Sequence, residues 1–261
     1  MNILDQIIAT KKREVALKKS IIPIKQLEQS VLFERKTNSL VHHLSNSSSG
    51  IIAEHKRRSP SKSIINQSNS VEEIVKGYEN GGASGISILT DNQHFGGSLD
   101  DLILARATTN LPLLRKDFMV DEFQIIEAKA FGADVILLIA AILTRDEIKK
   151  LSELAKSLQL EVLLEVHNQE ELDKSIMQSL DLIGVNNRNL KTFEVNLNYS
   201  KQLAEHIPSE FIKISESGID SAEAILELKE YGFTGFLMGE YFMKSDNPES
   251  EMKKFINKIK I

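Results

Sequence analysis

The chain alternates between short apolar runs and longer stretches in which apolar and polar residues are mixed. Several of the runs are apolar almost throughout, which is typical of parallel strands that are covered by helices on the outside. These runs predict strands at Ile51–Glu54, Ile86–Thr90, Pro112–Arg115, Val135–Ile139, Glu161–Val166, Leu182–Val185, Phe211–Ile214 and Gly235–Met238. They recur about every 20 to 35 residues, which is the spacing of a repeating strand–helix unit.

The stretches between the runs carry signals for the starts and ends of helices. Four capping residues are each followed by Glu three positions later: Ser70 by Glu73, Thr144 by Glu147, Asn168 by Glu171, and Asp220 by Glu223. Pro248 follows Asn247 where the first position of a last helix would fall. Gly81, Gly82 and Gly132 lie where helices are expected to end.

This number of units favours a closed barrel, although counting alone does not exclude an open doubly wound sheet. The fingerprint GxGxxG of dinucleotide-binding open sheets is absent. A chain of 261 residues suits one barrel, since such barrels typically have ~250 residues. We therefore predict an α/β fold, a (β/α)8 TIM barrel with an N-terminal helical extension. Residues 1–261 would form a single domain, with the extension at 1–49 and the barrel at 50–261.

The predicted extension contains two helical segments. The first has an apolar stripe that is formed by Ile3, Leu4, Ile7, Ile8 and Val15. We expect its basic face around Lys11, Lys12 and Arg13, a second helix within Ile24–Phe33, and a polar linker over Ser45–Gly50. The extension would cover the floor or the mouth of the barrel.

Composition excludes several classes of protein. A formal net charge of −5 argues against a general nucleic-acid binder. The absence of Cys excludes a disulfide framework, a thiolate zinc site and a thiol nucleophile. The longest uncharged apolar stretch, Val135–Leu143, is too short to span a bilayer, and the first residues do not resemble a secretory signal. We expect a cytoplasmic protein that has neither a membrane nor a nucleic acid as a partner.

Charged residues gather at the predicted strand ends, where barrel enzymes carry their catalytic groups. Glu54 and Lys56 are two positions apart on one strand, so their side chains share a face. Taken alone, this pair could be a structural ion pair. Lys116, Glu165 and Glu216 stand at three other strand ends. Three glutamates that face two lysines are more charge than a core needs, and they can act as acids, bases and anion binders.

Glycines at the last two strand ends, Gly218 and Gly239, predict a phosphate site. In such barrels the loops after strands seven and eight often bind phosphate through backbone N–H groups, which glycine lets a ligand approach. The histidines indicate no metal site. His167 is expected in a solvated loop, and His42 and His43 lack partners at metal-ligand spacing.

Seven sets of residues at the strand ends form a series: Ile52–Ser61, Ser87–Asp91 with Phe95–Ser98, Leu114–Phe118, Leu163–His167, Ile183–Leu190, Ser215–Ile219 and Gly239–Glu240. In this order they resemble the motifs of the indole-3-glycerol-phosphate synthase family. The resemblance extends from about residue 50 to residue 245, and the N-terminal extension also fits it.

The resemblance implies a carboxy-lyase of tryptophan biosynthesis. The reaction would be ring closure, decarboxylation and dehydration of 1-(2-carboxyphenylamino)-1-deoxyribulose 5-phosphate to indole-3-glycerol phosphate. Lys116 would be the general acid and Glu165 the general base. Lys56 would hold the substrate carboxylate and could share the role of acid. Glu54 and Asn186 would orient these groups and bind substrate hydroxyls. No cofactor or metal is required, the partner is this sugar-phosphate substrate, and a monomer is favoured.

Further site residues are implied by the same resemblance. Glu216 and Ser217 would line the site, and Arg188 would lie near its mouth. The remaining residues would hold the phosphate or the anthranilate ring: Ser59, Gly218, Gly239 and Glu240 for the phosphate, and Phe95, Phe118, Leu137 and Leu190 for the ring.

Two positions depart from the family pattern. His55 replaces an aliphatic residue, but it would face outward and affect packing. Lys244 follows Met243 where Arg is expected, which resembles a surface change.

Two other functions fit part of the pattern. Phosphoribosylanthranilate isomerase, another phosphate-binding barrel of the same pathway, uses a Cys base, and this chain has no Cys. A non-catalytic barrel that senses a sugar phosphate would be expected to lose some charged strand-end residues, whereas all are present here.

Overall fold

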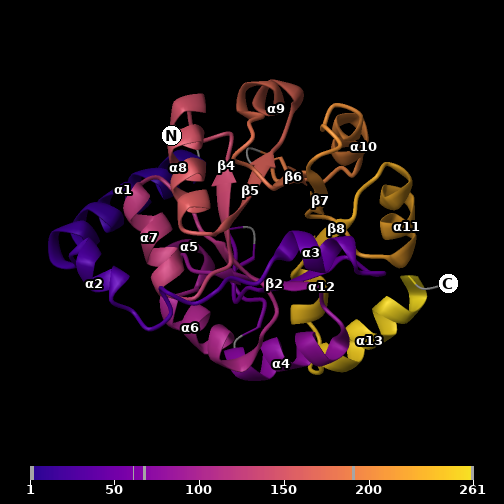
Figure 1. The fold of residues 1–261 in the computed structure, drawn as a ribbon. Coiled ribbons are helices and arrows are strands. Elements are labelled where there is room, and N and C mark those ends of the chain that lie inside the picture. Colours follow the sequence, from indigo (N-terminus) through magenta and orange to yellow (C-terminus); the bar gives the residue numbers. More distant parts are fainter. Residues whose placement is uncertain (1–2, 61, 67–68, 190–191, 260–261) are drawn as a thin grey trace.

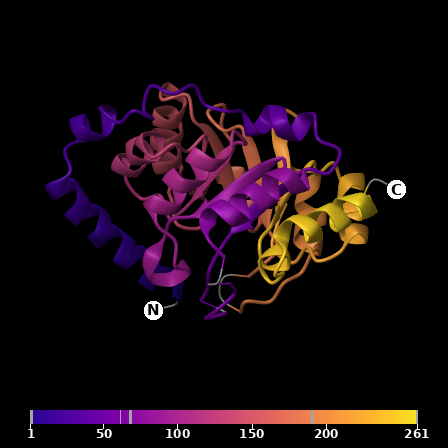
Figure 2. The same ribbon diagram turned by 90° about the horizontal axis from the view of Figure 1, so that it is seen from below.

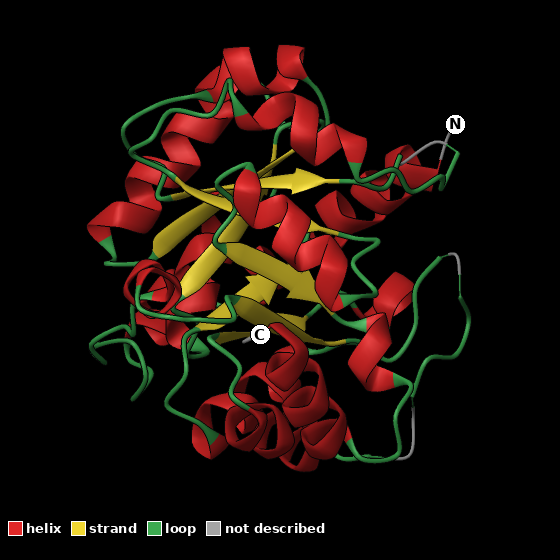
Figure 3. Ribbon diagram, turned by 90° about the vertical axis from the view of Figure 1, so that its right-hand side faces the viewer, coloured by secondary structure: helices red, strands yellow, loops and turns green. Residues whose placement is uncertain are grey.

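The eight predicted strands are present and close into a parallel barrel (Figures 1 and 3). The computed structural model describes residues 3–60, 62–66, 69–189 and 192–259. The strands are β1 (Ile51–His55), β2 (Gly85–Leu89), β3 (Leu113–Lys116), β4 (Val135–Ile139), β5 (Glu161–Val166), β6 (Leu182–Asn186), β7 (Ile212–Glu216) and β8 (Gly235–Met238). Each strand pairs with the next and β8 pairs with β1, which confirms the predicted TIM barrel.

Helices surround the barrel and follow the predicted signals closely. The outer helices are α4 (Val71–Gly81), α6 (Leu99–Thr108), α7 (Glu122–Ala130), α8 (Arg145–Ser157), α9 (Gln169–Ser175), α10 (Asn198–Ala204), α11 (Ala222–Glu230) and α13 (Pro248–Ile259). Short helices α5 (Asn92–Phe95) and α12 (Glu240–Met243) follow β2 and β8. No helix within the described ranges is long and apolar enough to cross a membrane.

The caps confirm three of the four predicted helix starts. Ser70 and Thr144 form reciprocal capping boxes, and the Asn168 side chain accepts a hydrogen bond from the backbone N–H of Glu171. The prediction of Asp220 as a cap is wrong. Ser221 caps α11 instead, because its hydroxyl accepts from the backbone N–H of Ala224.

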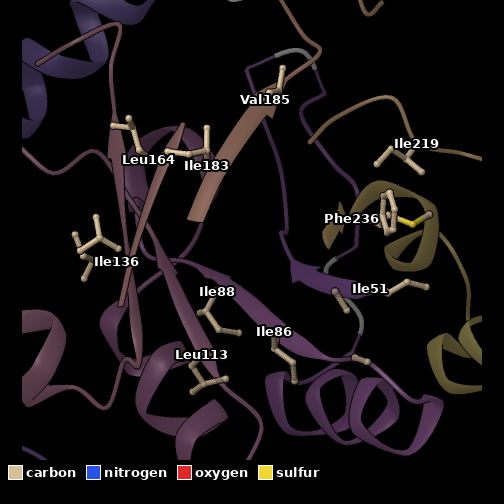
Figure 4. Close-up of a cluster of buried hydrophobic side chains, with 14 of the residues drawn as sticks. Ile51, Ile86, Ile88, Leu113, Ile136, Leu164, Ile183, Val185, Ile219 and Phe236 are labelled. Atoms are coloured by element: carbon tan, nitrogen blue, oxygen red, sulfur yellow. The ribbon is translucent and has the colours of Figure 1, made fainter. Parts of the chain in front are cut away.

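Alternation along each strand divides the core into two layers. Outward residues such as Ile51, Ile86 and Ile136 pack against the helices, and Figure 4 shows part of this layer. His55 belongs to the same outward face of β1 and is buried, as expected from its position. Inward residues such as Leu163 fill the interior of the barrel. The apolar packing inside leaves the carboxyl ends of the strands free to carry polar groups.

The N-terminal segment reaches both ends of the barrel (Figure 2). It contains α1 (Ile3–Ile21), α2 (Ile24–Glu28) and α3 (Leu40–Ser45). The second predicted helix is therefore shorter than expected, and α3 was not predicted. Leu40 and Leu44 of α3 plug the floor among inward core residues. The first turns of α1 lie at the opposite end, beside the mouth.

Lys11 corrects the predicted basic face of α1, because its side chain is buried. Its ammonium lies 3.0 Å from Asp91 and 3.0 Å from Asp117, and 2.9 Å from Glu14. Burial opposes the charge, but these carboxylates outweigh it and raise the pKa of Lys11. Asp117 also pairs with Arg115 at 3.2 Å, so the network ties α1 to the end of β3.

Lys11→Met should lower the free energy of unfolding by about 3–5 kcal/mol, because it leaves buried carboxylates without their counter-charge. Lys12→Met is the matched control, since Lys12 is exposed on the same helix. Urea denaturation measures both. Equal stability of the two variants would show that the buried network does not anchor α1.

Candidate active site

A pocket of about 420 Å³ opens at the carboxyl ends of the strands. It collects nearly all of the predicted site residues: Glu54, Lys56, Ser59, Phe95, Lys116, Phe118, Leu137, Glu165, Asn186, Arg188, Glu216, Ser217, Gly218, Gly239 and Glu240. Leu190, predicted to contact the ring, lies outside the described residues. Residues from every part of the barrel therefore converge on one cavity.

One wall of this pocket is apolar. Phe95 and Phe118 contact each other with ring centroids 6.0 Å apart, and Leu137 lies on the same lining. The first turns of α1 add three residues to it: Ile3, Leu4 and Ile7. The sequence predicted these as an apolar stripe but did not place them in the site. A flat ring is the kind of ligand group that such a wall accommodates.

Lys116 is the centre of the charged wall. Its ammonium donates to the carboxylate of Glu216 and lies 3.4 Å from Glu165 Oε2. Lys56 lies nearer the mouth and donates to Glu54 Oε1 at 2.6 Å. The three glutamates are buried, so these contacts supply the counter-charges that buried ions require.

Burial and mutual attraction set the protonation of this cluster. Burial lowers the pKa of Lys116, but Glu216, Glu165 and Glu54 outweigh it and raise that pKa. Burial acts against ionisation of Glu54 and Glu165, yet the neighbouring lysines lower both pKa values. Glu216 differs, because burial and the two other glutamates outweigh Lys116 and raise its pKa to about 7. The cluster therefore holds one exchangeable proton near neutral pH.

Two residues of β6 position the carboxylates of Glu165 and Glu216. Asn186 hydrogen-bonds Glu165 and accepts from the backbone N–H of Arg188 at 3.0 Å. Gly184 faces Glu216, and a Cβ there would lie 2.2 Å from Glu216 Oε1. Glycine at this position leaves the space that the carboxylate occupies.

His167 corrects a prediction, because it is not in a solvated loop. Its side chain is 12% exposed, with Nδ1 3.1 Å from Glu171 Oε2 and Nε2 3.5 Å from Glu165 Oε1. The sequence did contain a signal for this contact, because His167 and Glu171 are four residues apart across a predicted helix start.

The residues after β7 and β8 form another part of the pocket lining. Ser217 and Gly218 both have left-handed backbone, with φ values of 67° and 77°. Such strained turns are frequent at ligand sites. Gly239 packs against Glu54, where a Cβ would lie 2.8 Å from Oε1. Lys244, expected to be a surface change, also lines the pocket and pairs with Glu240 at 2.7 Å.

Within the described ranges, no three His, Cys, Asp or Glu side chains are grouped so that they could hold a metal ion. The fold and this pocket define a (β/α)8-barrel protein with a buried acid–base cluster between an apolar wall and a glycine-rich turn. A model of the indole-3-glycerol phosphate synthase family matches residues 4–255. The chain belongs to this family of enzymes.

Relatives support the same assignment over nearly the whole chain. An indole-3-glycerol phosphate synthase of Bacteroides thetaiotaomicron is 47% identical over 258 residues, covering 99% of each chain. One from Bacillus cereus is 45% identical and covers 95% of each. Among solved structures, a 3-hexulose-6-phosphate synthase from Salmonella typhimurium has a TM-score of 0.64 at 11% identity, covering 80% of this chain and 98% of its own. At that identity the likeness shows the fold alone.

Glu216→Gln should change how stability depends on pH. The folded-state pKa of Glu216 is raised from 4.5 to about 7, so the folded protein binds this proton more tightly than the unfolded chain does. The resulting stabilisation is fully present at pH values below the ordinary carboxyl pKa of 4.5. This contribution is lost as the pH rises through about 7. Denaturation from about pH 5 to about pH 8 should therefore show the wild type losing stability relative to the variant. A difference that stays constant over this range would place the shared proton elsewhere.

Proposed function

We propose that this protein is an indole-3-glycerol phosphate synthase of tryptophan biosynthesis. It converts 1-(2-carboxyphenylamino)-1-deoxyribulose 5-phosphate to indole-3-glycerol phosphate, carbon dioxide and water. Lys116 is the general acid and Glu165 the general base. The observation that carries this proposal is the contact of Lys116 with two buried glutamates inside a pocket that has an apolar wall and a left-handed turn at Ser217 and Gly218.

The two ends of the pocket orient the substrate. The anthranilate ring packs against the wall that contains Phe95, Phe118 and Leu137, and Leu190 would extend this contact. The phosphate binds at the other end, held by Ser59, Gly218 and the backbone of Gly239 and Glu240. Arg188 lies near the mouth. This arrangement sets the substrate carbonyl beside the charged wall, where positioning alone can lower the barrier.

Ring closure comes first and requires an electrophilic carbonyl. Lys116, which remains charged because its pKa is raised, donates a proton to the carbonyl oxygen as the ring carbon attacks. The iminium that forms draws electrons from the carboxylate carbon, and carbon dioxide leaves. Lys56, 21% exposed near the mouth, holds the carboxylate until then.

Dehydration completes the indole and needs both an acid and a base. Lys116, reprotonated from solvent after ring closure, protonates the departing hydroxyl, and Glu165 removes the proton from the neighbouring carbon. Glu54 and Asn186 orient the two lysines and Glu165, while Glu216 and Ser217 line the site. Glu165 suits the base, because its lowered pKa keeps it ionised at neutral pH. One chain supplies all of these residues, so the proposed site is complete in a monomer. The proposed place of action is the cytoplasm.

Lys116→Met should reduce kcat by ~10²–10⁴, or ~3–5 kcal/mol of barrier, with little change in substrate binding. Lys56→Met should instead raise KM, because the carboxylate loses its counter-charge. Indole fluorescence with the aniline-linked substrate measures both. Lys150→Met, exposed on α8, is the control for removing a lysine charge.

Near-normal turnover in Lys116→Met would remove this lysine from the mechanism and make Lys56 the next candidate acid. No indole formation by the wild type would contradict the proposed activity itself.

A further inference from the structure

We propose that His167 is a positioning residue that holds Glu165 in place and keeps it ionised as the base. This inference rests on the proposed function, because it assigns a role to a group behind the proposed general base. His167 follows β5 directly and stands two residues beyond Glu165. Among the described residues it is not part of the pocket lining, so it would act through Glu165 and not on the substrate.

Glu171 decides which ring nitrogen of His167 carries a proton. Its Oε2 accepts the backbone N–H of His167 at 2.9 Å and lies 3.1 Å from Nδ1. An ionised carboxylate can only accept hydrogen bonds, so Nδ1 must donate. Glu171 is held in turn by Asn168, which donates to Oε1 at 3.0 Å. The ring is therefore fixed from the α9 side.

The other ring nitrogen faces the base. Nε2 lies 3.5 Å from Glu165 Oε1, is buried, and has no hydrogen-bond partner among the described residues. Without a proton on Nε2, two lone pairs would oppose each other across this gap. With a proton there, His167 is an imidazolium that attracts Oε1, while Lys116 is near Oε2 at 3.4 Å.

The surrounding charges favour the imidazolium. Glu165 on β5, Glu171 on α9 and Glu216 on β7 all face the ring. Two lysines lie beyond them, since Lys116 contacts Glu165 and Lys174 lies near Glu171. Burial lowers the pKa of His167, but the three carboxylates outweigh it and raise that pKa. His167 and Lys116 thus hold opposite oxygens of one carboxylate.

His167→Gln tests this role, because it keeps a polar side chain but removes the charge. Loss of an adjacent opposite charge raises a carboxyl pKa by about one unit or more. The acid limb of the kcat profile should therefore move up by about that amount, so kcat at pH values on this limb, below the pKa of Glu165, falls by roughly tenfold and recovers at higher pH. KM should stay unchanged. Glu171→Gln should give a smaller shift in the same direction, and Glu170→Gln, exposed beside it, none.

The pKa of Glu165, followed through its carboxyl ¹³C signal, is independent of turnover. A raised value in His167→Gln supports the role even if the wild type makes no indole, which would contradict only the proposed function. An unchanged Glu165 pKa, or a kcat lowered equally at every pH, would overturn the inference and leave His167 a packing residue.

Discussion

The contact of the Lys116 ammonium with buried carboxylates is the interaction on which the mouth of the barrel depends. An isolated buried ion is prohibitively costly, so each charge at the mouth must be matched by another. The strand register supplies the partners, because β1, β3, β5 and β7 all end at this level. Odd-numbered strands place their last inward residues together in barrels of this type. One charge balance therefore satisfies the buried ions at the barrel mouth and sets the protonation of the proposed acid and base.

A second cluster of buried ion pairs, around Lys11, links the N-terminal segment to the site. Asp117 follows Lys116 directly and binds Lys11 of α1. Lys11 thus fixes both the helix and the backbone that carries Lys116. The same helix contributes Ile3 and Ile7 to the apolar wall. The extension is part of the binding pocket as well as a cover for the barrel.

Sequence patterns predicted what depends on local physics. The strands were found because buried parallel strands are apolar throughout, and Ser70 and Thr144 because capping boxes are local. The strand-end charges were found because a barrel brings the carboxyl ends of its strands together. Residues whose environment comes from distant segments were missed. The sequence around Lys11 is typical of an exposed helix face, but in the fold Asp91 and Asp117 surround its ammonium. His167 was expected in a solvated loop, but in the fold its ring lies against Glu165.

The most direct test of this account is the protonation state of Lys116 itself. Lysine labelled with ¹³C and ¹⁵N at the side-chain end gives a signal for each ammonium, and Lys116→Arg identifies the one that matters. This signal should stay in the charged form from neutral pH to beyond the ordinary lysine range, because the carboxylates raise the pKa of Lys116. Deprotonation of Lys116 below the ordinary range would contradict it, since burial would then outweigh the carboxylates.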